Sequence, residues 1–380
     1  MCDLKQAPAY TRVDFHQGPF VVFYEVTQAC DLVCQHCRAC AQPLRHPEEL
    51  DTETACELLG QLAQFPKSPL VVLTGGDPLK RSDVFDLVRR GVGTGLEMAM
   101  TPSATPLVTR TVLQRLHDEG LSRLAVSLDG VDAATHDAFR GVSGSFDRTW
   151  QILQQGRDVG LSLQVNTTVT AVNLEQIDAI AESLASCDIA LWSVFFLVPV
   201  GRGEQIDRIS AEQYEVVFDR LWHHAQTKPY GIKTTEAPHY RRFVLQRRGS
   251  PQGNTRSSDG VAHQRAPLGV NDGKGAMFID HTGRIFPSGF LPIECGQFPS
   301  DSLVDVYRDS SVFRSLRDAN LLRGKCGECE FRQICGGSRA RSYALTGDAL
   351  AAEPDCVYQP RQERLVQSMD ENQDQYEKQA

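Results

Sequence analysis

Three cysteines stand close together near the start of the chain, in the segment Cys30-Asp-Leu-Val-Cys34-Gln-His-Cys37. Thiolates at this spacing can bind three corners of a cubane iron–sulfur cluster, because soft sulfur ligands suit iron–sulfur chemistry. Such clusters usually take four protein ligands, so three cysteines leave one iron open to a substrate or cofactor. The alternative is a structural zinc site completed by Cys40 or His36, although a gap of three residues followed by two is unlike the usual zinc spacing.

A second group of cysteines lies far along the chain, at Cys326, Cys329, Cys335 and Cys356. Four thiolates can fully coordinate one cubane cluster, and they can also form a structural zinc site. A chain of 380 residues needs no disulfides to hold its core, and its first residues lack a secretory pattern. We therefore interpret the clustered cysteines as metal or cluster ligands and expect a cytoplasmic protein.

Composition excludes several other classes of function. Hydrophobic residues make up 41% of the chain and charged residues 23%, as in an ordinary globular protein. The net charge is −9, and Lys and Arg do not gather into a stripe, so we expect no nucleic-acid partner. No apolar run is long enough to span a bilayer, so we expect no membrane partner either.

The first half of the chain alternates short apolar runs with amphipathic segments, which is typical of a parallel α/β sheet, either open or forming an incomplete barrel. The predicted strands are 20–26, 70–74, 96–101, 124–128, 163–170 and 191–198. The predicted helices are 52–63, 83–90, 107–118, 146–159 and 174–184.

Polar and glycine-rich residues follow these strands where each strand ends. Cys30 follows the first strand, Thr74-Gly75-Gly76-Asp77-Pro78 follows the second, and Ser127 and Asp129 end the fourth. Carboxyl ends of parallel strands meet at one edge of a sheet, and ligands gather there. The sequence therefore predicts a single site that combines these residues.

The pattern changes after Gly201, and we divide the chain accordingly. Residues 1–19 are an N-terminal extension, 20–203 the main domain, 204–268 a helical and linker region, 269–360 a smaller second unit and 361–380 a polar tail. Within the linker region, 249–267 is rich in Gly, Ser, Pro and Gln and is predicted to be a mobile loop. The second unit begins with a predicted hairpin, 276–280 and 284–287.

The spacing of Cys30, Cys34 and Cys37 resembles the signature of the radical S-adenosylmethionine (SAM) superfamily. This resemblance implies a partial (βα)6 TIM-like barrel, a SAM-binding [4Fe–4S] cluster, and reductive cleavage of SAM to a 5′-deoxyadenosyl radical that abstracts hydrogen from a substrate. It also implies roles in SAM binding for residues of the shared edge, with His36 against the adenine and a bidentate guanidinium on the methionine carboxylate. The residues so assigned are His36, Gly75, Gly76, Asp77, Ser127, Asp129 and Arg140. Both charged residues also have a purely structural alternative: a helix cap for Asp129 and a surface salt bridge for Arg140.

The second cysteine group resembles the C-terminal auxiliary-cluster domain called SPASM. Ser288 and Arg339 stand where that domain usually has cysteines, and Cys295 is unassigned. The remaining four cysteines favour the shorter, single-cluster "twitch" arrangement. The resemblance thus implies a second [4Fe–4S] cluster in a smaller C-terminal α+β iron–sulfur domain.

Within the superfamily the chain resembles the branch of haem-biosynthesis enzymes and peptide maturases. The resemblance implies a reductant such as flavodoxin or ferredoxin, and a substrate that is a haem-like tetrapyrrole trimmed by oxidative decarboxylation. Maturation of a ribosomally made peptide is the first alternative, and an iron–sulfur electron carrier without radical chemistry or a zinc-dependent structural protein are others. The segment His239-Tyr240-Arg241-Arg242 fits either contact with an anionic substrate or a solvated helix start.

Overall fold

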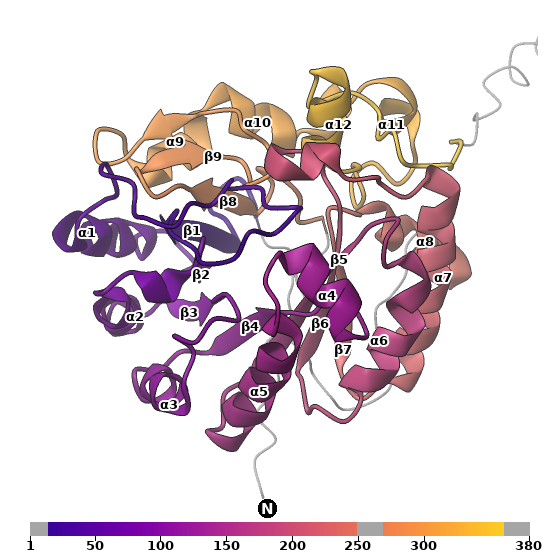
Figure 1. Ribbon diagram of the computed structural model, residues 1–380. Coiled ribbons are helices and arrows are strands. Elements are labelled where there is room, and N and C mark those ends of the chain that lie inside the picture. The colour runs from indigo at the N-terminus through magenta and orange to yellow at the C-terminus, as the bar shows by residue number, and fades with distance from the viewer. Residues whose placement is uncertain (1–13, 249–268, 361–380) are drawn as a thin grey trace, which may run out of the picture.

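The computed structural model describes residues 14–248 and 269–360 (Figure 1). Its centre is a ten-stranded sheet with the order β10-β9-β8-β1-β2-β3-β4-β5-β6-β7. Strands β1 to β7 pair with their neighbours in parallel, β8 is parallel to β1, and β9 and β10 are antiparallel additions at one end. The strands are β1 (Val21–Thr27), β2 (Leu70–Gly75), β3 (Glu97–Met100), β4 (Arg123–Ser127), β5 (Leu163–Val169), β6 (Leu191–Phe196), β7 (Gly231–Thr235), β8 (Ala276–Ile279), β9 (Arg284–Phe286) and β10 (Gly296–Gln297).

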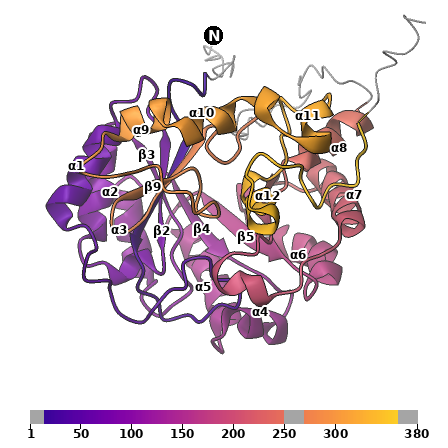
Figure 2. The same cartoon turned by 90° about the horizontal axis from the view of Figure 1, so that it is seen from above.

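Helices surround the curved sheet on its outer side, as the view from above shows (Figure 2). The helices of the first part are α1 (Thr52–Leu62), α2 (Val84–Gly93), α3 (Arg110–Asp118), α4 (Ala133–Arg140), α5 (Ser145–Asp158), α6 (Ile177–Leu184), α7 (Ala211–Thr227) and α8 (His239–Arg247). Those of the second part are α9 (Leu303–Asp309), α10 (Ser311–Arg317), α11 (Gly324–Glu328) and α12 (Arg339–Thr346). No helix in these described residues is both long and apolar enough to cross a membrane.

The core lies between the outer face of the sheet and these helices. Residues of the central strands, such as Tyr24, Leu73 and Trp192, are fully buried there. Side chains fix where the helices begin: Asp51, Thr109 and Asp132 each accept a hydrogen bond from a backbone N–H of the first turn. Local capping and buried strand faces thus explain why the predicted alternation of strands and helices is confirmed.

Four strands, β7 to β10, extend the sheet beyond the six that the sequence predicts for the main domain. β7 lies in the predicted linker region and pairs with β6. The predicted hairpin is confirmed as β8 and β9, and β8 continues the main sheet by pairing with β1. The C-terminal unit therefore shares its sheet with the barrel. The predicted mobile loop at 249–267, the polar tail at 361–380 and residues 1–13 of the N-terminal extension lie outside the described residues.

Candidate functional site

The carboxyl ends of the parallel strands surround a cleft of about 960 Å³, its open mouth included. Residues that are distant in the chain line it together: the first cysteine group, the glycines after β2, polar residues at the ends of β4 and β5, and Phe290 of the C-terminal unit. A cleft of this size is typical of a small-molecule or cofactor site. Its lining includes Cys30, Cys34, His36, Cys37, Gly75, Gly76, Ser127, Arg140, Asn166 and Thr168.

The loop that carries the three cysteines is held in place by the end of β6. The Arg202 side chain donates from Nε to the carbonyl of Cys34 (2.8 Å), and its backbone N–H donates to the carbonyl of Cys37 (3.1 Å). Gly201 adopts φ 57°, and a Cβ there would lie 2.7 Å from the carbonyl oxygen of Cys37. Only glycine fits so close an approach. Arg202 was not among the residues predicted from the sequence, although the turn that carries it follows the sixth strand, where site residues are expected.

The cysteine sulfurs themselves have polar neighbours. Cys30 Sγ lies 3.3 Å from Ser103 Oγ, and Arg140 Nη1 lies 3.8 Å from Cys34 Sγ. Burial raises the pKa of both Cys30 and Cys34, and Arg140 partly opposes this for Cys34. A positive charge beside a buried sulfur favours the thiolate form that cluster ligation requires.

The glycine pair after β2 lies directly against the start of the cysteine loop. Gly75 has φ 151°, and a Cβ on Gly76 would lie 2.3 Å from the carbonyl oxygen of Ala29. Asp77 does not line the cleft: its carboxylate is buried, accepts from Thr105 Oγ1 (2.8 Å) and caps the short turn Pro78–Lys80. Burial raises its pKa. Any contact of this segment with a ligand therefore comes from backbone atoms.

His36 faces the cleft and stacks on Phe139, with ring centroids 4.3 Å apart and planes 8° apart. Its Nδ1 is buried and has no hydrogen-bond partner among the described residues. Burial, followed by the charge of Arg140, lowers its pKa to about 3, so the ring is neutral at physiological pH. A neutral ring with an unused nitrogen suits contact with a heteroaromatic ligand.

Ser127 lines the cleft, whereas Asp129 lies behind it and forms a buried ion pair with Arg140. Arg140 Nε donates to Asp129 Oδ2 (2.8 Å), and the N–H of Thr168 donates to Oδ1 (2.7 Å). The two structural alternatives, a helix cap for Asp129 and a surface salt bridge for Arg140, are therefore wrong. Asp132, not Asp129, caps α4, and the Arg140 ion pair is buried, with 13% of the Arg140 side chain and none of the Asp129 side chain exposed.

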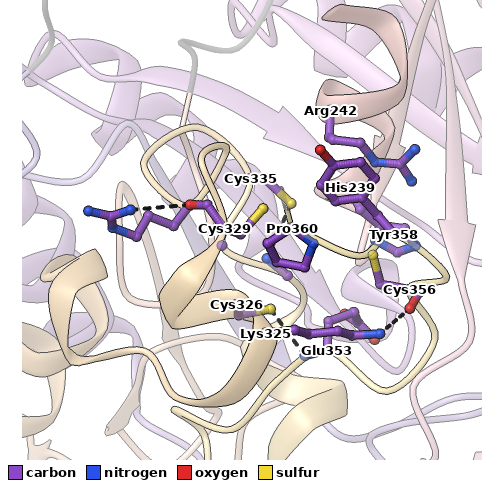
Figure 3. A pocket seen from close by; sticks show the side chains of 13 residues that line it. His239, Arg242, Lys325, Cys326, Cys329, Cys335, Glu353, Cys356, Tyr358 and Pro360 are labelled. Atoms are coloured by element: carbon purple, nitrogen blue, oxygen red, sulfur yellow. Dashed lines mark hydrogen bonds between the residues drawn. The ribbon is translucent and has the colours of Figure 1, made fainter. Parts of the chain in front are cut away.

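The second cysteine group lines a separate cavity in the C-terminal unit, and Figure 3 shows the four side chains around it. Backbone N–H groups donate to two of the sulfurs, from Gly337 to Cys335 (3.4 Å) and from Glu353 to Cys326 (3.3 Å). Burial raises the pKa of Cys335 to about 12 and that of Cys329 to about 11. The cysteines that line the cavity are Cys326, Cys329, Cys335 and Cys356.

Helix α8 of the barrel holds this second cysteine loop. Arg241 donates to the carbonyls of Ile334 (3.1 Å) and Val270 (2.6 Å), and Arg242 is paired with Glu215. His239 is buried against the cavity. Of the two interpretations of His239-Tyr240-Arg241-Arg242, the solvated helix start is therefore wrong.

The three positions left open by the resemblance to SPASM lie outside this cavity. Ser288 Oγ accepts from the N–H of Phe290, and the Cys295 thiol donates to the carbonyl of Ile293. Arg339 is buried and donates to the carbonyls of Ala349 and Ala351. The cavity thus offers four sulfur ligands from the cysteines alone.

The two donor sets match iron–sulfur chemistry in different ways. Three sulfurs face a cleft that has space for a further ligand, whereas four sulfurs line the smaller cavity. Within 14–248 and 269–360, no three His, Cys, Asp or Glu side chains are placed to hold a single metal ion. The first set fits a cluster with one open iron, and the second fits a fully coordinated cluster.

Comparison with known proteins agrees with this geometry. Residues 24–184 match the Radical SAM superfamily. The chain is 38% identical to the AdoMet-dependent heme synthase of Nitratidesulfovibrio vulgaris, over 90% of this chain and 93% of the relative. It is 36% identical to the enzyme of that name from Methanosarcina barkeri, over 90% and 97%. Among solved structures, Streptococcus suis SuiB bound to S-adenosylmethionine has the same fold, with a TM-score of 0.70 at 16% identity, over 90% of this chain and 78% of SuiB.

The chain therefore belongs to the radical SAM superfamily and is an enzyme that uses a [4Fe–4S] cluster and SAM. Both of these relatives, which match over 93% and 97% of their own length, are named AdoMet-dependent heme synthase. As a radical SAM enzyme it requires a reductant and a substrate.

Proposed function

We propose that this enzyme removes carboxyl groups from the side chains of a haem-like tetrapyrrole by oxidative decarboxylation. The observation that carries the proposal is the identity of 36% and 38%, along nearly the whole of both chains, with two enzymes named AdoMet-dependent heme synthase. The cleft supports it, because its size and mixed lining suit a small molecule beside a cofactor.

We assign the SAM-binding cluster to Cys30, Cys34 and Cys37, which leave one iron for the amine and carboxylate of SAM. Gly75, Gly76 and Ser127 line the cleft, and we assign backbone atoms of the two glycines to the methionine amine and Ser127 to the ribose. When bound, the cluster and SAM together supply one-electron cleavage of SAM and hydrogen abstraction from the substrate. The chain's own task is to orient these groups and to exclude water from them.

Arg140 and Asp129 position the site from one side. Arg140 lines the cleft and keeps its charge close to Cys34, while Asp129 fixes the guanidinium from behind. His36, with its free nitrogen, is assigned to the adenine. Asp77 contributes through its backbone, because its carboxylate caps the next turn.

We assign a second [4Fe–4S] cluster to Cys326, Cys329, Cys335 and Cys356. Oxidative decarboxylation removes one hydrogen atom and carbon dioxide and leaves one electron to be accepted, and a second cluster would supply that redox capacity. The external reductant is proposed to be a flavodoxin or ferredoxin. The enzyme is proposed to lie in the cytoplasm, where its thiols stay reduced.

The test uses anaerobically reconstituted enzyme with dithionite, SAM and an iron porphyrin that carries free propionates. We expect 5′-deoxyadenosine and, by mass spectrometry, decarboxylated porphyrin. Cys34→Ala should abolish both products, because the cluster loses one of its three protein ligands. Cys187→Ala is the matched control, since the Cys187 thiol donates to the carbonyl of Ser183 near the end of α6 and lines neither cysteine cavity.

The outcomes separate the competing functions. Formation of 5′-deoxyadenosine by Cys34→Ala at the wild-type rate would contradict the cluster assignment. An electron carrier would be reduced by dithionite but would release no 5′-deoxyadenosine. Radical formation without change to any propionate-bearing porphyrin would defeat the tetrapyrrole proposal and favour peptide maturation.

A further inference from the structure

The inner face of the barrel is only partly filled with packed side chains. Strand residues alternate between the two faces, so the neighbours of the fully buried Val22, Tyr24, Val71 and Leu73 point inward. Two inward residues, Phe23 and Val72, are half-exposed although they lie mid-strand. A closed barrel of eight strands normally fills its interior with such side chains. The partial exposure of Phe23 and Val72 therefore shows that this part of the inner face is not closely packed.

The two halves of this interior differ in chemistry. On β1, β2 and β8 these inward residues are apolar, whereas β4 to β7 present mostly polar ones. The apolar set is Val21, Phe23, Leu70, Val72 and Phe278, and the polar set is Arg123, Gln164, Asn166, Ser193 and Lys233. A ligand with an extended apolar surface and a polar edge matches this division.

Lys233 lies in the same row of the sheet as residues that line the cleft. The strand register places Ser127, Asn166, Ser193 and Lys233 side by side in one row across β4, β5, β6 and β7. Ser127 and Asn166 both line the cleft. In a sheet, residues of one row point to the same face, so Lys233 faces the space that the cleft opens into.

Arg123 is a second cation on the same inner face. It begins β4, two residues before Ala125 and four before Ser127, and it pairs in register with Ala99. Its Nε is buried without a hydrogen-bond partner. β4 and β7 are three places apart in the curved sheet, and the charge of Arg123 contributes to lowering the pKa of Lys233.

Neither cation has an acidic partner within 14–248 and 269–360. Lys233 and Arg123 form no ion pair there, and Glu97, on the inner face of β3, does not pair with Arg123. Burial, followed by the charge of Arg123, lowers the pKa of Lys233 to about 8. Two half-buried, unpaired and mutually repelling cations reduce the stability of the folded chain, and a bound anion would relieve both effects.

We propose that Lys233 and Arg123 together bind a carboxylate of the substrate inside the barrel, opposite the apolar wall. This inference rests on the proposed function, since it assigns the contact for a propionate of the tetrapyrrole. One bound carboxylate holds the macrocycle in a fixed orientation, so that another side chain is presented to the cleft. The two cations are thus positioning residues that determine specificity.

The experiment measures binding rather than turnover. Reconstituted wild-type enzyme, Lys233→Met and Arg123→Gln are titrated without SAM, and the porphyrin Soret band is followed. The ligands are iron mesoporphyrin IX, which has two free propionates, and its dimethyl ester. Lys228→Met is the matched control, because Lys228 pairs with Glu182 at the outer end of α7.

We expect each inner variant to bind the free acid about tenfold or more weakly than wild type, as for loss of a charged hydrogen bond. Binding of the ester should be weak and equal in all variants, and Lys233→Arg should restore most of the affinity for the acid. Lys233→Met should melt no lower than wild type, because it removes an unpaired buried charge. A lower melting temperature with equal loss of acid and ester binding would show a structural role instead.

The result separates this inference from the proposed function. Wild-type affinity for the free acid in both inner variants would overturn the inference alone. Tight, cation-dependent binding without any decarboxylation by the complete wild-type reaction would overturn the proposed function alone. Failure of wild type to bind either porphyrin would overturn both.

Discussion

At the scale of single residues, the protonation state of a buried charged group at the cleft depends on the charge of its partner. Burial alone would raise the pKa of Asp129, but the charge of Arg140 holds it below its ordinary value. Asp129 therefore stays ionised and keeps the guanidinium turned toward Cys34. A single buried charge on either residue would destabilise the fold, so the two act as one unit.

A second buried pair gives the structure a pH dependence. His281 Nδ1 lies 2.7 Å from Glu25 Oε1, and Arg38, which lines the cleft, also donates to Glu25. Burial alone would lower the pKa of His281, but the hydrogen bond and the charge of Glu25 raise it above its ordinary value. The pair thus contributes stability that is fully present below the unfolded pKa of about 6.5 and is lost as pH rises through the folded pKa.

We predict that His281→Gln lowers the melting temperature more at about pH 6 than at about pH 9, because only the protonated histidine forms the ion pair. Thermal unfolding of apo-protein under reducing conditions measures this. His117→Gln is the control: His117 lies exposed on α3 beside Asp118 and should show little effect at either pH. An equal loss at both pH values for His281→Gln would contradict the prediction.

The sequence predicts the site residues that lie at the ends of strands. It does not predict contacts that depend on which strands pair with each other. Cys30, Gly75 and Ser127 follow strands, so their meeting in one cleft follows from parallel topology alone. The contact of Glu25 with His281 joins β1 to a turn near the far end of the chain. No local pattern encodes such a contact, because it depends on which strands become neighbours.

At the scale of elements, the turn after β2 and the loop after β1 form one unit. The N–H of Gly76 donates to Thr27 and that of Asp77 to Ala29, which extends the pairing of the two strands into the site. The atoms that a side chain on Gly76 would meet are backbone atoms of the cysteine loop. The glycine therefore sets where Cys30 lies.

We predict that Gly76→Ala weakens SAM binding by about tenfold or more, since a clash with backbone of this kind costs about 1–3 kcal/mol. Equilibrium dialysis of SAM against reconstituted enzyme measures the affinity, and iron analysis reports on the cluster. Gly93→Ala is the control, because a Cβ there meets nothing within 4 Å and α2 should change by no more than about 1 kcal/mol. Unchanged SAM affinity in Gly76→Ala would count against the tight contact.

The elements that the sequence did not predict share a physical reason. β7 has the sequence Gly-Ile-Lys-Thr-Thr and is half-buried along its whole length, so it lacks the apolar run of a central strand. β8 was predicted as part of a hairpin, but its parallel partner β1 comes from the other end of the chain. Whether a strand lies at an edge, and which distant strand it pairs with, is decided only when the whole sheet assembles, so neither can be predicted from a local sequence pattern.

At the scale of the whole molecule, the shared sheet makes the barrel and the C-terminal unit one structure. Met277 and Ile279 of β8 are fully buried in the same core as Val22 and Tyr24 of β1. Removal of β8 would expose this core and leave one side of β1 unpaired.

We therefore predict that the enzyme unfolds in a single cooperative transition, and that a chain ending after Arg248 shows none. Differential scanning calorimetry measures both, with a chain ending after Pro360 as the control because it keeps every described element. A cooperative transition near the wild-type temperature in the chain ending after Arg248 would show that the barrel is stable alone.

The pairing of β8 with β1 also sets an order of events during synthesis. β1 and the first cysteine loop leave the ribosome early, but the strand that completes their side of the sheet emerges only after most of the chain has been translated. The loop thus lacks a neighbouring strand on one side until β8 has been translated. Delivery of the SAM-binding cluster is then expected to follow the synthesis of β8 rather than to accompany that of the cysteine loop itself.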